Sequence, residues 1–218
     1  MHRKISYVGM DLSGPVNIAD TAIVSFTPED QHLVLHQHLT CASDDRIVAL
    51  IRELNASGEV AAGLDAPLSY NPGGGDRPGD RKLRELIFRA GMRPGSVMPP
   101  TMTRMVYLTL RGVTLANQLR QIDPRNIRIV EVHPGAAMVL RGAPVQDVIE
   151  FKKSTAARKR LSAWLAKEGL YGADELSDES DHSLAACAAA LAAWKWHAGK
   201  AAWLEPAAPP HHPFDYAC

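Results

Sequence analysis

The chain has 218 residues, of which 46% are hydrophobic and 22% are charged, a balance that is typical of globular proteins. Lys plus Arg and Asp plus Glu each number 24, so the formal net charge is zero. A protein that coats nucleic acid through its overall charge is usually basic, so that class is excluded, and any contact with nucleic acid must come from a local patch. The length suits one α/β domain with an insertion.

Signals for export and membrane insertion are lacking in the sequence. The first residues have no apolar signal-peptide core, and no run of about 18 apolar residues occurs. Cys41, Cys187 and Cys218 are far apart and lack metal-ligand spacing, which favours a reducing compartment over a disulfide scaffold. We therefore expect a cytoplasmic protein without a membrane partner.

Three predicted strands open the chain. They are residues 4–10, 21–27 and 32–40. Their connections are short, which favours an antiparallel meander. A helix is predicted from Asp44, with apolar residues at helical spacing, and the Ser57-Gly58 pair ends it. Residues 59–64 then form a continuous apolar run, which is typical of a strand buried on both faces.

The second half of the chain alternates loops and helices around one clear strand. Residues 66–80 are rich in Pro and Gly and predict a loop, and residues 127–132 predict a strand that stops at His133-Pro134. Helices are predicted at residues 80–90, 103–121, 154–168 and 181–197. The last helix is rich in alanine and is expected to be buried, although an apolar face left exposed on it would support a homodimer.

The order of these elements indicates the fold class. Three antiparallel strands followed by parallel strands with crossover helices is the order of an RNase H-like α/β fold. Right-handed crossovers place the fourth strand beside the first and the fifth beside the fourth. We expect a single domain at residues 1–205, with a loop and helical insertion after the fourth strand at residues 66–125. Residues 206–218 contain four prolines and are expected to form an irregular tail.

Three acidic residues lie at the carboxyl ends of predicted strands: Asp11, Asp65 and Glu131. If these strands are parallel neighbours, the carboxylates share one sheet edge, where open α/β sheets bind ligands. Carboxylates at short range repel one another, and a divalent cation removes that repulsion. Mg²⁺ or Mn²⁺ accepts such oxygen ligands, and a pair of ions can stabilise both reacting oxygens during phosphodiester hydrolysis.

Asp181 begins the last helix and is expected to be a fourth ligand, because the apolar stripe of that helix should face the sheet. Asp178 lies one turn earlier and is a substitute for it. Each acid also has a structural alternative, since Asp11 and Asp65 precede turns and an Asp at a helix start is commonly a cap. We favour the metal interpretation because three acids lie at separate strand ends.

Basic residues follow the loop after the fourth strand. Arg77 and Arg81, together with Arg111 in a helical stretch, are predicted to contact substrate phosphates. The alternative for this region is a solvated helix face. A second basic cluster at residues 152–160 lacks aromatic neighbours and is interpreted as such a face.

Two histidines adjoin the predicted acids. His133 follows Glu131 by two residues, and His182 is next to Asp181. Either could orient a water or act as a general acid, but a hydrogen-bonded structural histidine is the more common situation.

Six segments occur in an order that resembles a known family. They are GMDLSGP (9–15), GLDAPLS (63–69), DRKLRE (80–85), LRG (110–112), EVHP (131–134) and DHSLAACAAALAAW (181–194). Together they resemble the domain-of-unknown-function family number 429, which carries the label of predicted nucleases with an RNase H fold. The resemblance covers nearly the whole chain. It implies a nuclease-type metal site at Asp11, Asp65, Glu131 and the start of the last helix. The family often has an Asp one turn later in that helix, where this chain has Ala185.

The leading hypothesis is therefore a divalent-metal-dependent nuclease with nucleic acid as its substrate. One alternative is a nucleotide-binding phosphotransferase with an actin-like core, although the chain has a single core and no Gly-Lys-Ser/Thr phosphate loop. Another alternative is a catalytically degenerate binding or scaffold protein, which Ala185 and the neutral net charge favour.

Overall fold

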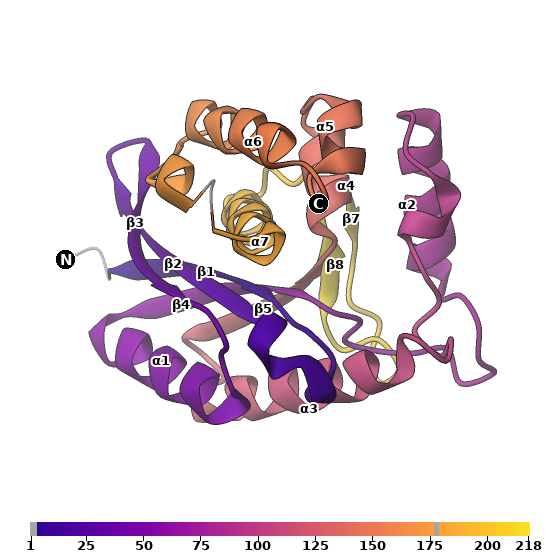
Figure 1. Ribbon diagram of the computed structural model, residues 1–218. Helices are drawn as coiled ribbons and strands as arrows, with labels where there is room; N and C mark the ends of the chain where they lie inside the picture. Colours follow the sequence, from indigo (N-terminus) through magenta and orange to yellow (C-terminus); the bar gives the residue numbers. More distant parts are fainter. Residues whose placement is uncertain (1–3, 177–178) are drawn as a thin grey trace.

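One mixed β-sheet forms the centre of the computed structural model, which describes residues 4–176 and 179–218 (Figure 1). The strand order is β6-β3-β2-β1-β4-β5-β8-β7. The strands are β1 (Ile5–Asp11), β2 (Ala22–Glu29), β3 (His32–Leu39), β4 (Glu59–Asp65), β5 (Ile127–Val132), β6 (Leu170–Tyr171), β7 (Leu204–Glu205) and β8 (Asp215–Ala217).

The first five strands have the predicted arrangement. β1, β2 and β3 pair in antiparallel fashion, whereas β1, β4 and β5 pair in parallel. The fourth strand lies beside the first and the fifth beside the fourth, as right-handed crossovers require. The chain thus has the mixed sheet of an RNase H-like α/β fold, and the predicted fold class is confirmed.

Helices cover both faces of the sheet (Figure 1). The α-helices are α1 (Asp44–Ser57), α2 (Pro78–Arg89), α3 (Val106–Ile122), α4 (Pro134–Leu140), α5 (Val145–Glu150), α6 (Thr155–Lys167) and α7 (Asp181–His197). Three short 3-10 helices are η1 (Pro15–Asp20), η2 (Pro94–Ser96) and η3 (Ala173–Leu176). α1 and α3 pack on one face, and α4 to α7 pack on the other, so the sheet separates two apolar cores.

α7 lies closer to the sheet than ordinary side chains would allow. A Cβ atom at Gly9 of β1 would stand 1.9 Å from the carbonyl oxygen of Ala186, and one at Gly63 of β4 would stand 2.5 Å from that of Ala189. Glycine in the strands and alanine in the helix therefore let the two backbones nearly touch. This close packing explains why the last helix is so rich in alanine, and it fixes the position of the first turn of α7 over the strand ends.

Replacing Gly9 with Ala should destabilise the protein strongly, because the new methyl group meets helix backbone that cannot rotate away. We expect a loss of about 3 kcal/mol or more in the free energy of unfolding, measured by urea titration. Gly14→Ala is the matched control, since nothing lies within 4 Å of its Cβ position and its φ of −62° suits alanine. Equal stabilities of the two variants would contradict this account of the packing.

The prediction of an irregular tail at residues 206–218 is wrong for its last part. β8 pairs in parallel with β5 and in antiparallel fashion with β7, and the side chains of Tyr216 and Ala217 are buried. A strand of three residues is too short to show the alternation of apolar and polar side chains that identifies strands. The preceding prolines therefore dominated the prediction and indicated irregular structure. The helices α4 and α5 also lie in a region, residues 134–150, for which no element was predicted.

The exposed helix face that would have supported a homodimer does not exist. Every residue of α7 from Ser183 to Ala193 is buried within the chain itself. The helix runs between the sheet and α4 and α6, which cover its outer side (Figure 1). Among the described residues, no helix is both long enough and apolar enough to span a membrane.

Candidate active site

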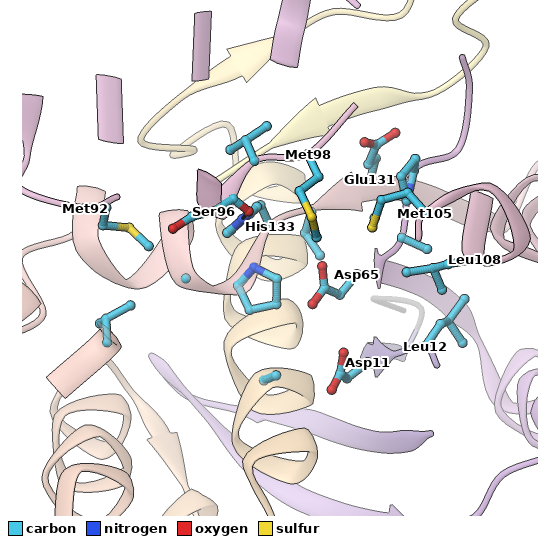
Figure 2. Close-up of a pocket in the computed structure, with 18 of the residues that line it drawn as sticks. Asp11, Leu12, Asp65, Met92, Ser96, Met98, Met105, Leu108, Glu131 and His133 are labelled. Atoms are coloured by element: carbon cyan, nitrogen blue, oxygen red, sulfur yellow. Dashed lines mark hydrogen bonds between the residues drawn. The ribbon is translucent and has the colours of Figure 1, made fainter. Parts of the chain in front are cut away.

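Two aspartates meet at the carboxyl ends of β1 and β4. Asp11 and Asp65 are the last residues of these parallel strands and are direct register partners. They lie two residues after Gly9 and Gly63, so strand alternation directs both side chains to the face covered by α7. Their carboxyl groups are close enough to hydrogen-bond to each other, which requires a proton between them or a cation beside them (Figure 2).

The surroundings of this pair disfavour two negative charges. Burial raises the pKa of Asp65 well above its usual value, and the neighbouring charge of Asp11 raises it further. Burial also raises the pKa of Asp11, although a hydrogen bond with His182 opposes this shift. The two groups therefore titrate as one unit, which keeps a proton to a higher pH than isolated aspartates would.

His182 contacts the pair from the first turn of α7. Its Nδ1 lies 2.7 Å from Oδ2 of Asp11, and that hydrogen bond raises the pKa of His182 against the opposing effect of burial. His182 is thus hydrogen-bonded, as the structural alternative predicted, and it also lies at the centre of the site. The position follows from the Ser180 cap, whose Oγ accepts a hydrogen bond from the amide of Ser183 and so starts the helix at Asp181.

Asp181 lies at the rim of the same site. It lines the cavity that Asp11 and Asp65 face, and its Oδ1 is 4.0 Å from Nε2 of His182. The prediction that the start of the last helix reaches the strand ends therefore agrees with its position. Asp178, the predicted substitute, lies outside the described residues.

Glu131 does not point in the same direction as the two aspartates. In the β4–β5 ladder it pairs with Leu64 rather than with Asp65. Paired residues of adjacent strands project to the same side, so Glu131 leaves the sheet on the side of Leu64, where α1 and α3 pack. A shift of one residue in register thus turns Glu131 away from the two aspartates, although it lines the same cavity and its charge contributes to raising the pKa of Asp65, whose largest cause is burial.

The carboxylate of Glu131 is also fully engaged. Its Oε1 accepts a hydrogen bond of 2.5 Å from Nη2 of Arg77, and its Oε2 accepts bonds from Nη1 of Arg77 and from the amide of Leu68. Asp80 binds the same guanidinium from the first turn of α2. We infer that Glu131 holds Arg77 and the loop after β4 in place, a different role from the one predicted for it.

Arg77 has no donor left for a substrate phosphate. Its Nε–H binds Asp80, and the four remaining N–H groups bind Ser69, Asp80 and, twice, Glu131. Burial alone would lower the pKa of Arg77, but the charges and hydrogen bonds of the two carboxylates raise it, so it remains a cation. The ring of Tyr216 covers the guanidinium at 5.3 Å, which places β8 in this cluster as well.

Arg111 is occupied in a similar way beside the loop after β1, and it does not line the cavity. Its guanidinium binds Asp44, the carbonyl oxygens of Ser13 and Ala42, and Oγ1 of Thr21. It therefore fixes the loop that follows Asp11 instead of contacting a substrate.

Arg81 is exposed on α2 and lies outside the cavity. The phosphate contacts predicted for Arg77 and Arg111 are thus not supported by their surroundings. No observation places Arg81 at the site.

The two aspartates face a cavity of about 460 Å³. Two other basic residues, Arg93 and Lys152, line it and are exposed. The charge of Lys152 acts on both Asp11 and Asp65 and lowers their pKa values against the dominant effect of burial. These two cations are the better candidates for contact with an anionic ligand. Lys152 was predicted to lie on a solvated helix face, and only the fold of residues 134–153 brings it to the cavity.

The far wall of the cavity is a loop, residues 90–105, that several side chains hold by its backbone. His133 contacts the carbonyl oxygen of Ser96 through Nε2, and Arg84 donates to that of Val97. Nδ1 of His133 accepts a hydrogen bond from the amide of Ala136, and burial lowers the pKa of this ring. Both ring nitrogens are therefore engaged, and His133 has the structural role that we considered the more common one.

The thiols do not offer a nucleophile in this site. Burial raises the pKa of Cys187 and of Cys218 to about 12, so both stay protonated at neutral pH. Cys41 is exposed and does not line the cavity.

The donor set fits a divalent cation only in part. Among residues 4–176 and 179–218, no three His, Cys, Asp or Glu side chains lie close enough together to form a metal site by themselves. Asp11 and Asp65 nevertheless provide two adjacent carboxylates, and Mg²⁺ commonly binds to one or two carboxylates while waters or substrate phosphates fill its other positions. The residues present would suit one such ion, whereas Glu131 is unsuited to bind a second.

Comparison with known proteins identifies the family. The family described as Protein of unknown function (DUF429) matches residues 9–210. The chain belongs to this family. Searches of curated proteins and of solved structures found no match. The match of the DUF429 family confirms the resemblance inferred from the six ordered segments, and those segments contain both aspartates and the first turn of α7. Ala185, at the position where the resemblance led us to expect an Asp, lines the cavity in this member of DUF429.

Removing the charge of Arg77 should destabilise the fold. Arg77→Met leaves Asp80 and Glu131 buried without their partner, and we expect a loss of about 3–5 kcal/mol in the free energy of unfolding, measured by urea titration. Arg81→Met on the exposed side of the same helix is the control and should change stability by less than about 0.5 kcal/mol. A stable Arg77→Met variant would mean that the arginine is available for another role.

Neutralising Asp65 should stabilise the metal-free protein at neutral pH. An acid whose pKa is raised by folding keeps its full contribution to stability below its unfolded pKa of 3.8, and that contribution falls as pH rises. Asp65→Asn removes the carboxyl group whose ionisation destabilises the folded protein. We therefore expect the free energy of unfolding to rise by about 1 kcal/mol at pH 7, and this gain should vanish near pH 4. Unfolding by urea in the presence of a chelator measures it, and a loss of stability at pH 7 would contradict the proposed electrostatics.

Proposed function

We propose that this protein is a divalent-metal-dependent hydrolase that cleaves phosphodiester bonds, with Asp11 and Asp65 as its central groups. One observation carries this proposal: two buried, adjacent carboxylates face a cavity at the carboxyl ends of neighbouring parallel strands. Ligands bind at this edge of open α/β sheets. Two carboxylates in contact are unfavourable unless a cation or a proton joins them, so the pair is a ready binding site for Mg²⁺ or Mn²⁺.

The roles of the residues follow from their positions. Asp11 and Asp65 would hold the cation, which when bound polarises a phosphate oxygen and lowers the pKa of water. Lys152 and Arg93 would bind the negative oxygens of the substrate at the open side of the cavity. His182 would orient Asp11 through their hydrogen bond, and Asp181 would provide a further acceptor for a bound water.

Nucleic acid is the proposed source of the phosphodiester. The resemblance to predicted nucleases and the RNase H-like fold favour it, but they are analogies of fold rather than properties of the site. The local chemistry that supports it is an acidic pair with cations beside it in one cavity.

A binding protein without hydrolytic activity is the second candidate. Two observations favour it: the cavity wall has Ala185 at the position where the resemblance led us to expect an acid, and Glu131 is engaged by Arg77. Such a protein would retain the cavity and bind the same class of ligand without turning it over.

Metal titration by calorimetry, combined with an assay of a chromogenic phosphodiester, distinguishes these functions. Wild type should bind Mn²⁺ and hydrolyse the diester, and the Asp11→Asn/Asp65→Asn variant should lose both, with a drop of at least about 100-fold in activity. Asp30→Asn is the control, because Asp30 is exposed in the β2–β3 turn and its φ of 51° is acceptable for asparagine.

Either of two results would overturn the assignment. Undiminished hydrolysis by the double variant would show that another site acts. Ligand binding by the wild type without metal binding or turnover would identify the binding-protein alternative.

A further inference from the structure

One wall of the cavity is apolar, although its centre is charged. Leu12 is buried, and Met98, Met105 and Leu108 are half-buried with their remaining exposure at the cavity. Figure 2 shows Met98, Met105, Leu12 and Leu108 gathered around Asp65 and Asp11. A site that bound only a phosphate and its metal would have no use for this surface, because apolar side chains beside a charged group hinder its hydration.

The apolar wall is also held rigidly. The segment that carries Met98 is fixed by hydrogen bonds to the carbonyl oxygens of Ser96, Val97 and Pro100, which come from His133, Arg84 and Thr109 respectively. Bonds on both sides of Met98 keep its backbone in place. The wall is thus a preformed surface, and binding against it would lose little conformational entropy.

The charged side of the cavity contains the acids and the two free cations. Lys152 and Arg93 line it together with Asp11 and Asp65. Arg77 and Arg111, in contrast, donate their hydrogen bonds to carboxylates, hydroxyls and backbone groups within the chain. The cavity therefore offers a short subsite for one anionic group and its cation. A cavity of about 460 Å³ falls within the range of small-molecule pockets and not of open grooves for duplexes.

These features define a ligand with two unlike ends. Thioether groups are polarisable and make favourable contacts with aromatic rings, so Met98 and Met105 suit a planar aromatic group. Asp11, Asp65 and Lys152 suit a phosphate with its cation. The distinct walls lie around one cavity, so a single small molecule would contact both.

We propose that the cavity binds one nucleotide unit, with the base against Met98, Met105 and Leu108 and the phosphate beside the aspartates. The phosphate part of this proposal rests on the proposed function, but the base subsite does not. The unit is either a free mononucleotide or the terminal nucleotide of a strand, since both present the same chemistry. A polynucleotide would enter by its end, because a cavity of about 460 Å³ has room for one nucleotide unit and not for a continuous strand.

The test compares adenosine 5′-monophosphate with ribose 5-phosphate, which has the same phosphate and no base. Calorimetry with Mg²⁺ should show the nucleotide binding about tenfold more tightly to the wild-type protein. Met98→Gln/Met105→Gln should abolish this preference while leaving the affinity for ribose 5-phosphate within about twofold. Met102→Gln is the matched control, since Met102 lies in the same segment, is 37% exposed and does not line the cavity.

Other arms separate this inference from the hydrolytic proposal. In Asp11→Asn/Asp65→Asn the preference for the nucleotide over ribose 5-phosphate should persist even though metal binding is lost. A failure to detect catalysis would therefore not contradict the base subsite. Competition by a 5′-phosphorylated single-stranded oligonucleotide would assign the site to strand ends, and its absence would assign the site to free nucleotides.

Three results would overturn the inference: equal affinity for the two probes, a preference that survives Met98→Gln/Met105→Gln, or tighter binding of hexyl phosphate than of the nucleotide. The last result would mean that the wall selects for apolar area and not for an aromatic ring. Circular dichroism of each variant ensures that the comparison is between folded proteins.

Discussion

The backbone contact between α7 and the sheet is the constraint on which the rest of the structure depends. Glycine at positions 9 and 63 removes the only atoms that would keep the helix at an ordinary distance, and alanine on the helix does the same from the other side. The helix is consequently buried along most of its length and runs directly to the ends of β1 and β4. Its first turn brings His182 within hydrogen-bond distance of Asp11, so the geometry of the site follows from a packing solution in the core.

Two internal arginines then fix the loops around that site. Arg77 joins β5 to the start of α2, and Arg111 joins α3 to the loop after β1 and to α1. Each uses its donors on partners within the chain, which makes the loops rigid but leaves no charge for a ligand. The side chains of the cations that remain at the cavity, Arg93 and Lys152, make no ion pair or hydrogen bond among the described contacts. The basic residues that position the loops are thus different from those that are exposed at the cavity.

Much of the fold could be predicted from the sequence, because the strands and helices have strong periods and the order of the elements restricts the topology. The Asp11–Asp65 pair could be predicted for the same reason, since both residues end strands that had to be parallel neighbours. The side of the sheet on which Glu131 lies could not be predicted. A register shift of one residue moves its side chain to the opposite face of the sheet, and no sequence pattern fixes the β4–β5 register. The contact between Arg77 and Glu131 joins residues that are 54 positions apart, so the sequence does not reveal that the guanidinium is engaged. The strand at Tyr216 is too short for a periodic signal.

The bond between Arg77 and Glu131 has a consequence for how the chain evolves and folds. Glu131 would be an unpaired buried charge in any version of the protein that lacked the loop at residues 66–80, so this loop is not a detachable module. The sheet and the loop must become ordered together, since β5 cannot bury its acid before the loop closes over it. Amide hydrogens in this loop, such as that of Leu68, should consequently exchange with solvent only when the central strands open, although loops of this composition ordinarily exchange fast.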